Sequence, residues 1–327
     1  MPIASTEPQT PSSEYAVVDW LLDSDPSIRW QVMRDLADAP DELVAAERAR
    51  IAAEGWGAQL LDQQRPDGNL GDGISAPHWR SNLYTLLLLL LRYLGVDPRN
   101  ARARNAIDRV RERVDWGDEW GNSPFFEGEV EPCINGGVLA IGAYFGAGCD
   151  RLADRLLSEQ LADGGWNCDA EPGSVRSSFH TTICVLEGLL AYETATGASA
   201  AVSDARARAH EYLLERRMFR KLSTGEAIDP AKGNTPMPSW TRFVFPSMWQ
   251  YDLLRGLEYL RSARIKDHDR TKGAVGIVVE RRIPDGRWLL DASPRDAIAD
   301  DPESAPGKPS RWNTLRAMRV LDWFAAR

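Results

Sequence analysis

Two cysteines, a histidine and a glutamate form the strongest chemical group in the sequence: Cys133, Cys168, His180 and Glu131. Thiolate, imidazole and carboxylate groups hold zinc in proteins, and three such ligands leave a coordination position open for a substrate. Bound zinc lowers the pKa of a substrate thiol or water, or acts as a Lewis acid on a carbonyl or phosphoryl oxygen. The alternative is structural, with small buried thiols and a hydrogen-bonded core histidine. We expect a zinc site that includes Cys133 and His180, completed by either Glu131 or Cys168.

Tryptophans form a second group, at or just before the starts of apolar helical stretches: Trp30, Trp79, Trp249 and Trp312. If they face one funnel, their ring faces can hold an apolar chain or stabilise a carbocation. Two alternatives are that they fill wedge-shaped gaps between helices, or that they form a platform for a sugar. We expect Trp79, Trp249 and Trp312 to bind substrate.

Polar side chains at the same helix starts form a third group. Helix N-termini carry partial positive charge and favour an anion such as a diphosphate, to which arginines can donate bidentate hydrogen bonds. Asp252 is the expected general acid or base, although a capping carboxylate is the alternative. Tyr251 and His78 are further catalytic candidates. The predicted binding residues are Arg80, Asn135, Arg176 and Arg311, although Arg311 could instead pair with a loop carboxylate.

Composition limits the classes of function. The 327-residue chain is 43% hydrophobic and 27% charged, which allows a sizeable core. Its net charge of −9 disfavours electrostatic binding of nucleic acid or an anionic membrane over a large surface. The apolar run Leu83 to Leu91 is far shorter than the roughly 20 residues of a membrane span. Residues 1–13 are polar and proline-rich, so we expect a disordered tail, one domain over residues 14–327 and a cytoplasmic protein.

A repeated turn sets the organisation of the chain. Gln160 to Trp166 and Arg282 to Trp288 share one spacing, and Gln64 to Leu70 follows it with leucine in place of tryptophan. Each has a long polar residue, then Asp-Gly, then a large apolar residue. Glycine accepts the left-handed conformation that ends a helix, and the tryptophan can fill the gap beside the next repeat. Weaker versions occur at Asp118 to Gly121 and Ser223 to Glu226.

Apolar and polar-faced helical stretches alternate around these turns with a period of roughly 50 residues. Six apolar stretches are predicted to form an inner layer: 28–37, 81–94, 134–145, 181–194, 249–260 and 312–324. Six amphipathic stretches are predicted to form an outer layer: 14–22, 41–61, 102–114, 150–161, 204–217 and 271–281. The β-branched run 275–279 could instead be a strand. The pattern predicts an all-α (α/α)6 toroid of alternating inner and outer helices. The outer-layer and loop histidines, His210 and His268, are expected to be exposed.

These motifs carry a family resemblance. The spacing Gln160 to Trp166 is similar to the QW repeat of squalene cyclases, over most of the chain from about residue 41. Phe179-His180 resembles the helix that supplies the zinc histidine in protein prenyltransferase β-subunits, and Glu131-Pro-Cys133 resembles their Asp-x-Cys zinc pair. The resemblance implies an α/α toroid whose funnel binds isoprenoid-like molecules. In the prenyltransferase form, Glu131, Cys133 and His180 would hold the zinc.

The sequence also departs from those families. It lacks the Asp-x-Asp-Asp acid of proton-initiated cyclases and the Asp-Asp-x-x-Asp motif of ionising synthases, and Glu131 replaces an aspartate. We therefore expect a zinc enzyme that acts on a hydrophobic, isoprenoid-like small molecule by prenyl transfer or cyclisation. The alternatives are a zinc-free cyclase with Asp252 as acid and a non-catalytic toroid that binds an apolar ligand. A glycosidase-like toroid ranks below them. A partner subunit is possible but not indicated.

Overall fold

The computed structural model describes residues 13–63, 77–118, 121–170, 173–197, 199–228, 239–292 and 305–326, and the regular elements within them are helices. The all-α prediction is confirmed. One layer consists of α2 (Pro26–Asp35), α5 (Pro77–Leu94), α7 (Pro132–Phe145), α9 (Phe179–Thr196), α11 (Leu253–Ser262) and α13 (Arg311–Ala325). The other consists of α1 (Ser13–Leu22), α3 (Asp41–Arg50), α4 (Gly55–Asp62), α6 (Ala101–Arg113), α8 (Asp150–Ser158), α10 (Ala200–Glu215) and α12 (His268–Glu280). None of these helices is long and apolar enough to cross a membrane.

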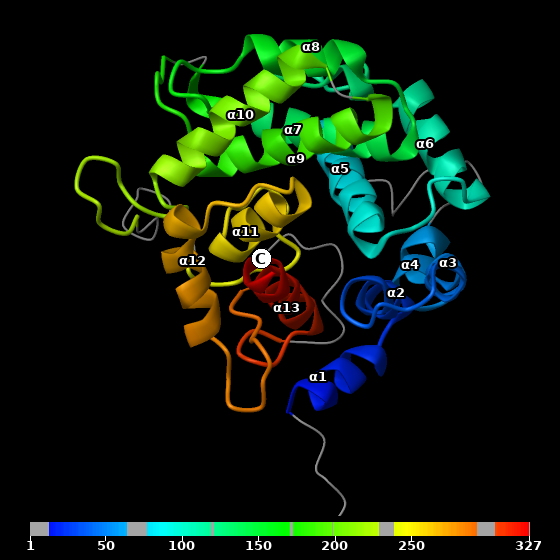
Figure 1. Ribbon diagram of the computed structural model, residues 1–327. Coiled ribbons are helices and arrows are strands. Elements are labelled where there is room, and N and C mark those ends of the chain that lie inside the picture. Colours follow the sequence, from blue (N-terminus) through cyan, green and yellow to red (C-terminus); the bar gives the residue numbers. More distant parts are fainter. Residues whose placement is uncertain are drawn as a thin grey trace, which may run out of the picture.

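The first layer closes into a ring in chain order, which is the predicted α/α toroid. Neighbouring inner helices pack together from α5 through α7, α9, α11 and α13 to α2 (Figure 1). Trp30 Nε1 of α2 donates to the Leu94 carbonyl at the end of α5, 3.0 Å away, and this contact completes the ring.

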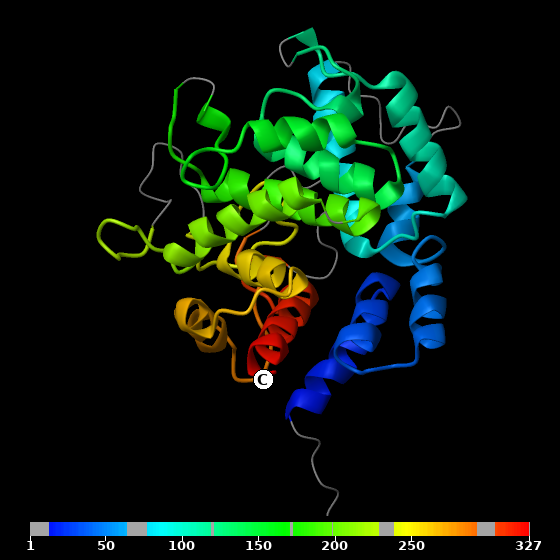
Figure 2. The same cartoon turned by 45° about the horizontal axis from the view of Figure 1, so that its top comes forward.

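The outer helices return the chain between inner ones, so inner neighbours run in the same direction. Arg311 at the start of α13 contacts Trp20 and Asp23 before α2. Arg319 farther along α13 contacts Asp35 at the end of α2. Figure 2 shows the same helices from a second direction.

The predicted repeat is visible in the hydrogen bonds of its two described turns. Trp166 Nε1 donates to the Leu156 carbonyl of α8, and Trp288 Nε1 donates to the Val278 carbonyl of α12, each at 2.7 Å. Both indoles are fully buried. The Trp166 and Trp288 backbone N–H groups donate to Thr182 and Thr314 of the following inner helices, each at 3.1 Å. The positions two residues after the N-caps of α9 and α13, His180 and Trp312, are therefore equivalent. Cys133 likewise lies two residues after the N-cap of α7.

Two glycines bring α7 and α9 unusually close. A Cβ on Gly188 would lie 2.4 Å from the Gly136 carbonyl oxygen, and a Cβ on Gly136 would lie 2.5 Å from the Cys184 backbone. Since only hydrogen fits at these positions, the two backbones approach to contact. This pair of helices carries Cys133, His180 and Cys184.

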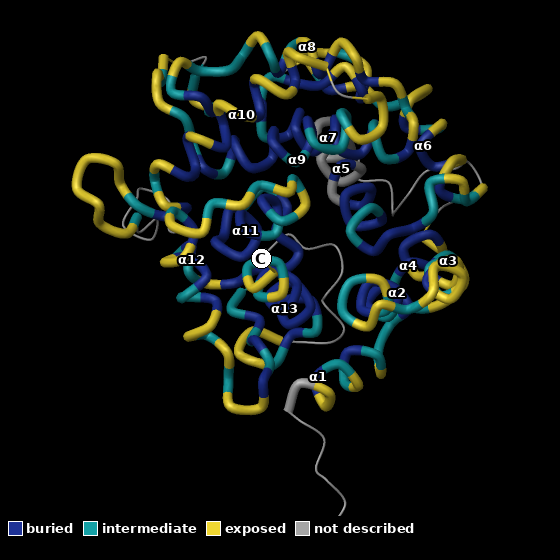
Figure 3. Tube along the Cα trace, in the orientation of Figure 1, coloured by how far each residue is buried: buried dark blue, intermediate teal, exposed yellow. Residues whose placement is uncertain are grey.

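Two expectations about the outer layer need correction, and the strand alternative for a third stretch is excluded. The stretch 41–61 is not one helix, because the chain turns at residues 51–54 and Gly55 has a φ of +65°. The β-branched run 275–279 lies within α12, where Val275 and Val278 face the core. His210 is only 8% exposed, so the expectation that it faces solvent is wrong. Figure 3 shows the difference in burial between the two layers: buried residues predominate along the inner helices α9 and α13, and exposed ones are frequent along the outer helices α3 and α8.

Candidate functional site

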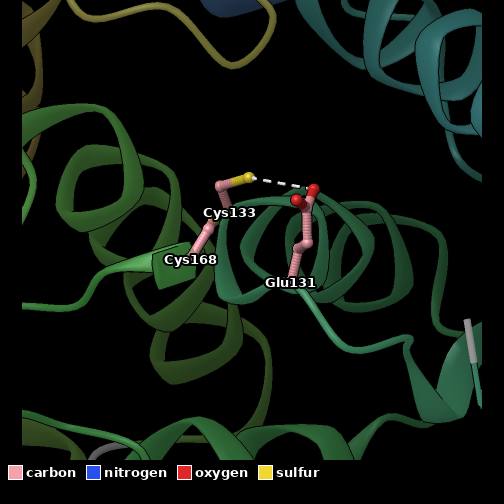
Figure 4. A group of neighbouring side chains, drawn as sticks. All are labelled: Glu131, Cys133 and Cys168. Atoms are coloured by element: carbon pink, nitrogen blue, oxygen red, sulfur yellow. Dashed lines mark hydrogen bonds between the residues drawn. The ribbon is translucent and has the colours of Figure 1, made fainter. Parts of the chain in front are cut away.

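Glu131, Cys133 and Cys168 converge at the N-terminal rim. Glu131 is the N-cap of α7, Cys133 lies in its first turn, and Cys168 begins a short 3-10 turn before α9. One carboxylate oxygen and the two sulfurs lie within 4.8 Å of one another, and all three residues are half-buried (Figure 4). The predicted alternatives for completing the site, Glu131 and Cys168, are therefore both present.

The two thiols differ in acidity because they interact. Interaction with Cys168 raises the pKa of Cys133, and interaction with Cys133 lowers that of Cys168. Thr181 Oγ1, 3.4 Å from Cys168 Sγ, also lowers the pKa of Cys168. Cys133 Sγ lies 4.0 Å from Glu131 Oε2, and burial raises the pKa of that carboxyl. Cys168 is thus the first of the pair to become a thiolate.

This donor set fits zinc. For Zn–ligand distances of about 2.0–2.3 Å, tetrahedral ligand atoms lie roughly 3.5–3.8 Å apart, so small side-chain movements suffice here. Two thiolates and a carboxylate match the preferences of zinc, and three protein ligands leave one position open. Metal binding would displace the thiol protons.

His180 lies outside the group of three. Its Nδ1 accepts a hydrogen bond from the Tyr251 backbone N–H at 2.8 Å, and its Nε2 lies 3.4 Å from Trp240 Nε1. Burial lowers the pKa of His180 to about 4, so the ring is neutral near pH 7. Both ring nitrogens face N–H donors, so His180 could join the metal only after giving up its contact with Tyr251 or with Trp240.

Glu129 is a candidate that sequence reasoning missed. It is 2% exposed, its Oε2 accepts from the Glu131 N–H at 2.9 Å, and its Oε1 is buried without a hydrogen-bond partner among the described residues. Burial is the main cause that raises the pKa of Glu129 to about 8. The carboxyl is therefore mainly protonated at neutral pH. The alternating glutamates before Pro132 were the available signal, but nothing local marked Glu129 as buried.

Asn135 positions these glutamates. Its Oδ1 accepts from the Glu129 N–H and its Nδ2 donates to the Glu129 carbonyl, each at 2.7 Å. Gly128, at a φ of +83°, leaves room for it, because a Cβ there would lie 2.4 Å from Asn135 Oδ1. In this structure the amide of Asn135, predicted to bind substrate, holds the loop.

Asp252 and Tyr251 are both held by the backbone. Asp252 caps α11 by accepting from the Arg255 N–H at 2.7 Å and the Val244 N–H at 3.1 Å, and Arg316 lies 3.7 Å away. Burial raises the pKa of Asp252. The Tyr251 hydroxyl donates to the Met218 carbonyl at 2.7 Å. These contacts match the capping alternative considered for Asp252.

The remaining predicted rim residues have varied surroundings. Arg311 donates to the Trp20 and Asp23 carbonyls and stacks 4.6 Å from the Trp20 ring, so it links α13 to α1. Arg176 is exposed in the loop before α9, and half-buried Trp249 precedes α11. His78, Trp79 and Arg80 fall in the first turn of α5, and their side chains lie outside the described part of the structure.

Trp312 and Trp30 line a cavity of about 430 Å³ inside the ring. Trp312 stacks on Phe245 with ring centroids 4.5 Å apart and planes 12° apart. Other lining residues come from the C-terminal halves of the inner helices, including Tyr93, Tyr259 and Ser262. The described cavity therefore extends toward the rim opposite Cys133.

Comparisons with known proteins give structural likenesses only. No protein-family model and no curated protein matches the chain. A protein from Actinoplanes is 17% identical with a TM-score of 0.47, over 96% of this chain and 99% of that one. The type II terpene cyclase MstE from Scytonema is 17% identical with a TM-score of 0.48, over 94% and 96%. A variant of MstE in complex with its substrate, geranylgeranyl dihydroxybenzoate, is 17% identical with a TM-score of 0.45, over 95% of both chains. At this identity the chemistry of the chain has to be derived from its own side chains.

Proposed function

We propose that this chain is a zinc-dependent enzyme that acts on a hydrophobic, isoprenoid-like small molecule by prenyl transfer or cyclisation. The observation that carries the proposal is the convergence of Glu131, Cys133 and Cys168 within 4.8 Å at the inner-helix N-termini. Two half-buried thiols and a carboxylate from separate segments are a donor set that zinc prefers. The close approach of α7 and α9 keeps the cluster in place.

Each residue has a distinct part in this proposal. Cys168, whose pKa is lowered, is the first anionic ligand, and Cys133 follows when zinc replaces its proton. Glu131 supplies the carboxylate, and Asn135 holds the loop that carries it. Zinc bound there would activate a nucleophile or polarise a substrate oxygen. The stacked Trp312 and Phe245 give the ring interior flat apolar surfaces that suit a hydrophobic substrate.

Elemental analysis of the purified protein, with chelated and zinc-reloaded samples, tests the metal site. We expect about one zinc per chain, with at least a 100-fold loss of affinity in Cys133→Ser and Cys168→Ser. Cys149→Ser is the matched control, because Cys149 is buried away from the group. Zinc retained by the Cys133→Ser/Cys168→Ser double variant would contradict the proposal. His180→Ala separates a three-ligand site, which keeps zinc, from one in which the ring turns and binds.

A second candidate function is a zinc-free, proton-initiated cyclase. It is favoured by the unpartnered buried Oε1 of Glu129, a carboxyl that is protonated near neutral pH. Glu129 suits the role of acid better than Asp252, whose oxygens accept two backbone N–H groups. Turnover of prenylated substrates that survives chelation and is lost in Glu129→Gln would favour this candidate. A tight apolar ligand without turnover or metal would favour a binding protein.

A further inference from the structure

The cavity inside the ring has a chemistry unlike that of the rim. Seven arginines of the described chain line it, against two carboxylates, Glu187 and Glu258. Arg255 pairs with Glu187 at 2.7 Å, and Glu258 lies 3.3 Å from Arg316 and 3.4 Å from Arg319. Asp35 and Asp252 add counter-charge behind this layer. The lining nevertheless keeps an excess of guanidinium groups.

Two of the lining arginines have no described carboxylate within ion-pair distance. Arg48 donates to the Gly95 carbonyl and to the Tyr144 hydroxyl, each at 2.8 Å, and its guanidinium lies 5.1 Å from the Trp30 ring. Arg92 stacks 5.9 Å from the Tyr93 ring. Arg48 donates to the carbonyl of Gly95, which directly follows α5, and Arg92 lies in the last turn of that helix, so both arginines lie at the same end of the cavity.

A buried and incompletely satisfied arginine adds an independent observation. Arg319 is 6% exposed and lines the cavity, and its Nε has no hydrogen-bond partner among the described residues. Burial lowers the pKa of Arg319 despite the carboxylates nearby. Buried polar groups are normally satisfied, so this Nε–H group lacks an acceptor even though both Nη groups of Arg319 have one.

The inner-helix C-termini explain why arginines gather at this end. Their carbonyl groups carry partial negative charge, which stabilises cations nearby. The charge of the helix ends explains why arginines lie here. It does not explain why a cavity of about 430 Å³ remains open between them. The volume is within the range of small-molecule sites, and aromatic faces alternate with the charges.

We propose that this cavity is a binding site for a small organic anion, a phosphate or carboxylate on a flat apolar body, with Arg48 and Arg92 holding the anionic group. Trp30 and the Trp312–Phe245 stack contact the apolar body. The apolar part of this site is the Trp312–Phe245 surface already proposed for the hydrophobic substrate, and the inference adds where an anionic group binds. The site shares no residue with the Glu131, Cys133 and Cys168 cluster and does not depend on zinc.

Calorimetric titration of the full chain with 1-naphthyl phosphate, 1-naphthoate and 1-naphthol tests this site. We expect both anions to bind at least tenfold more tightly than naphthol, because charge-assisted hydrogen bonds are about twice as strong as neutral ones. Their relative affinities distinguish a phosphate site from a carboxylate site. Equal binding of the two anions and naphthol, or no binding of any of them, would overturn the proposal.

Substitutions test whether naphthyl phosphate binds in this cavity. Arg92→Gln should weaken naphthyl phosphate at least tenfold, whereas Arg151→Gln, with a side chain 84% exposed outside the cavity, should not. Leu190→Trp should block the cavity without removing charge, since Leu190 lines it. Circular dichroism and melting temperature confirm folding. Cys133→Ser should bind naphthyl phosphate normally, so failure of the zinc proposal leaves this result intact. Unchanged binding in both Arg92→Gln and Leu190→Trp would overturn the proposal.

Discussion

At the scale of residues, the surroundings give side chains of the same type different pKa values and different burial. Interaction with Cys133 lowers the pKa of Cys168, whereas burial raises the pKa of Cys149 to about 11. Glu129 and Glu131 lie two positions apart, yet Glu129 is nearly fully buried and lacks a partner for one oxygen. The sequence identified Glu131, Cys133 and Cys168 by type and missed Glu129, because burial depends on what packs over the loop.

His210 gives a prediction about pH. Its Nε2 lies 2.8 Å from the Tyr259 hydroxyl, and burial lowers the pKa of His210 from 6.5 to about 4. The unfolded chain therefore binds more protons between pH 6.5 and 4, so stability falls as pH drops through this window. At about 1.4 kcal/mol per pKa unit, the titration of His210 lowers the free energy of unfolding at pH 5 by up to about 2 kcal/mol relative to neutral pH.

Urea unfolding of wild type and His210→Gln at pH 7.5 and pH 5 measures this contribution. We expect a smaller acid-induced loss in the variant, because glutamine does not titrate. The comparison is between the two pH differences, so the cost of the substitution itself cancels. Equal losses in the two proteins would show that His210 is not the group responsible.

At the scale of elements, glycines and turns decide how helices meet. Gly136 and Gly188 allow α7 and α9 to touch, which sets the position of Cys133 relative to the loop that carries Cys168. The Asp-Gly turns end α8 and α12 alike, and the tryptophan that follows each turn ties the outer helix to the next inner one. Local spacing predicted the turns, whereas the close approach of two helices had no local signal.

Gly188→Ala tests the contact between α7 and α9. Its Cβ would lie 2.4 Å from backbone, which cannot move away cheaply, so we expect a loss of about 1–3 kcal/mol in unfolding free energy. Gly276→Ala in α12 is the matched control. A Cβ there meets nothing within 4 Å, so higher helix propensity should stabilise the protein by about 0.5–1 kcal/mol. Similar midpoints in urea for the two variants would refute the packing explanation.

At the scale of the whole molecule, the two ends of the described chain close the ring. Arg319 of α13 donates to Gln31 Oε1 at 2.8 Å and pairs with Asp35 of α2. Arg311 continues the closure to α1 through two backbone carbonyls. The ring separates two regions, a thiol and carboxylate cluster at the N-terminal rim and an arginine-lined cavity toward the other end.

Arg311→Ala tests the closure through α1. Removing a buried charged group that donates to carbonyls lowers stability by about 1.5–3 kcal/mol. The side chain of Arg311 is half-buried, so we expect a smaller loss. We expect roughly 5- to 30-fold faster amide exchange within residues 13–22, with little change in α7 and α9. Hydrogen-exchange mass spectrometry gives both values. Unchanged exchange in α1 would mean that other contacts hold it.

The sequence by itself determined the helices, their alternation and the repeated turn, because helical periodicity and glycine conformation are local properties. It also placed Cys133 and His180 at equivalent heights on successive inner helices, as the capping positions show. Only the tertiary structure decided that Cys168 meets Cys133 while His180 turns to Tyr251. The arginines of α2, α5, α11 and α13 come to one cavity for the same reason: side chains far apart in the sequence become neighbours only when the ring closes.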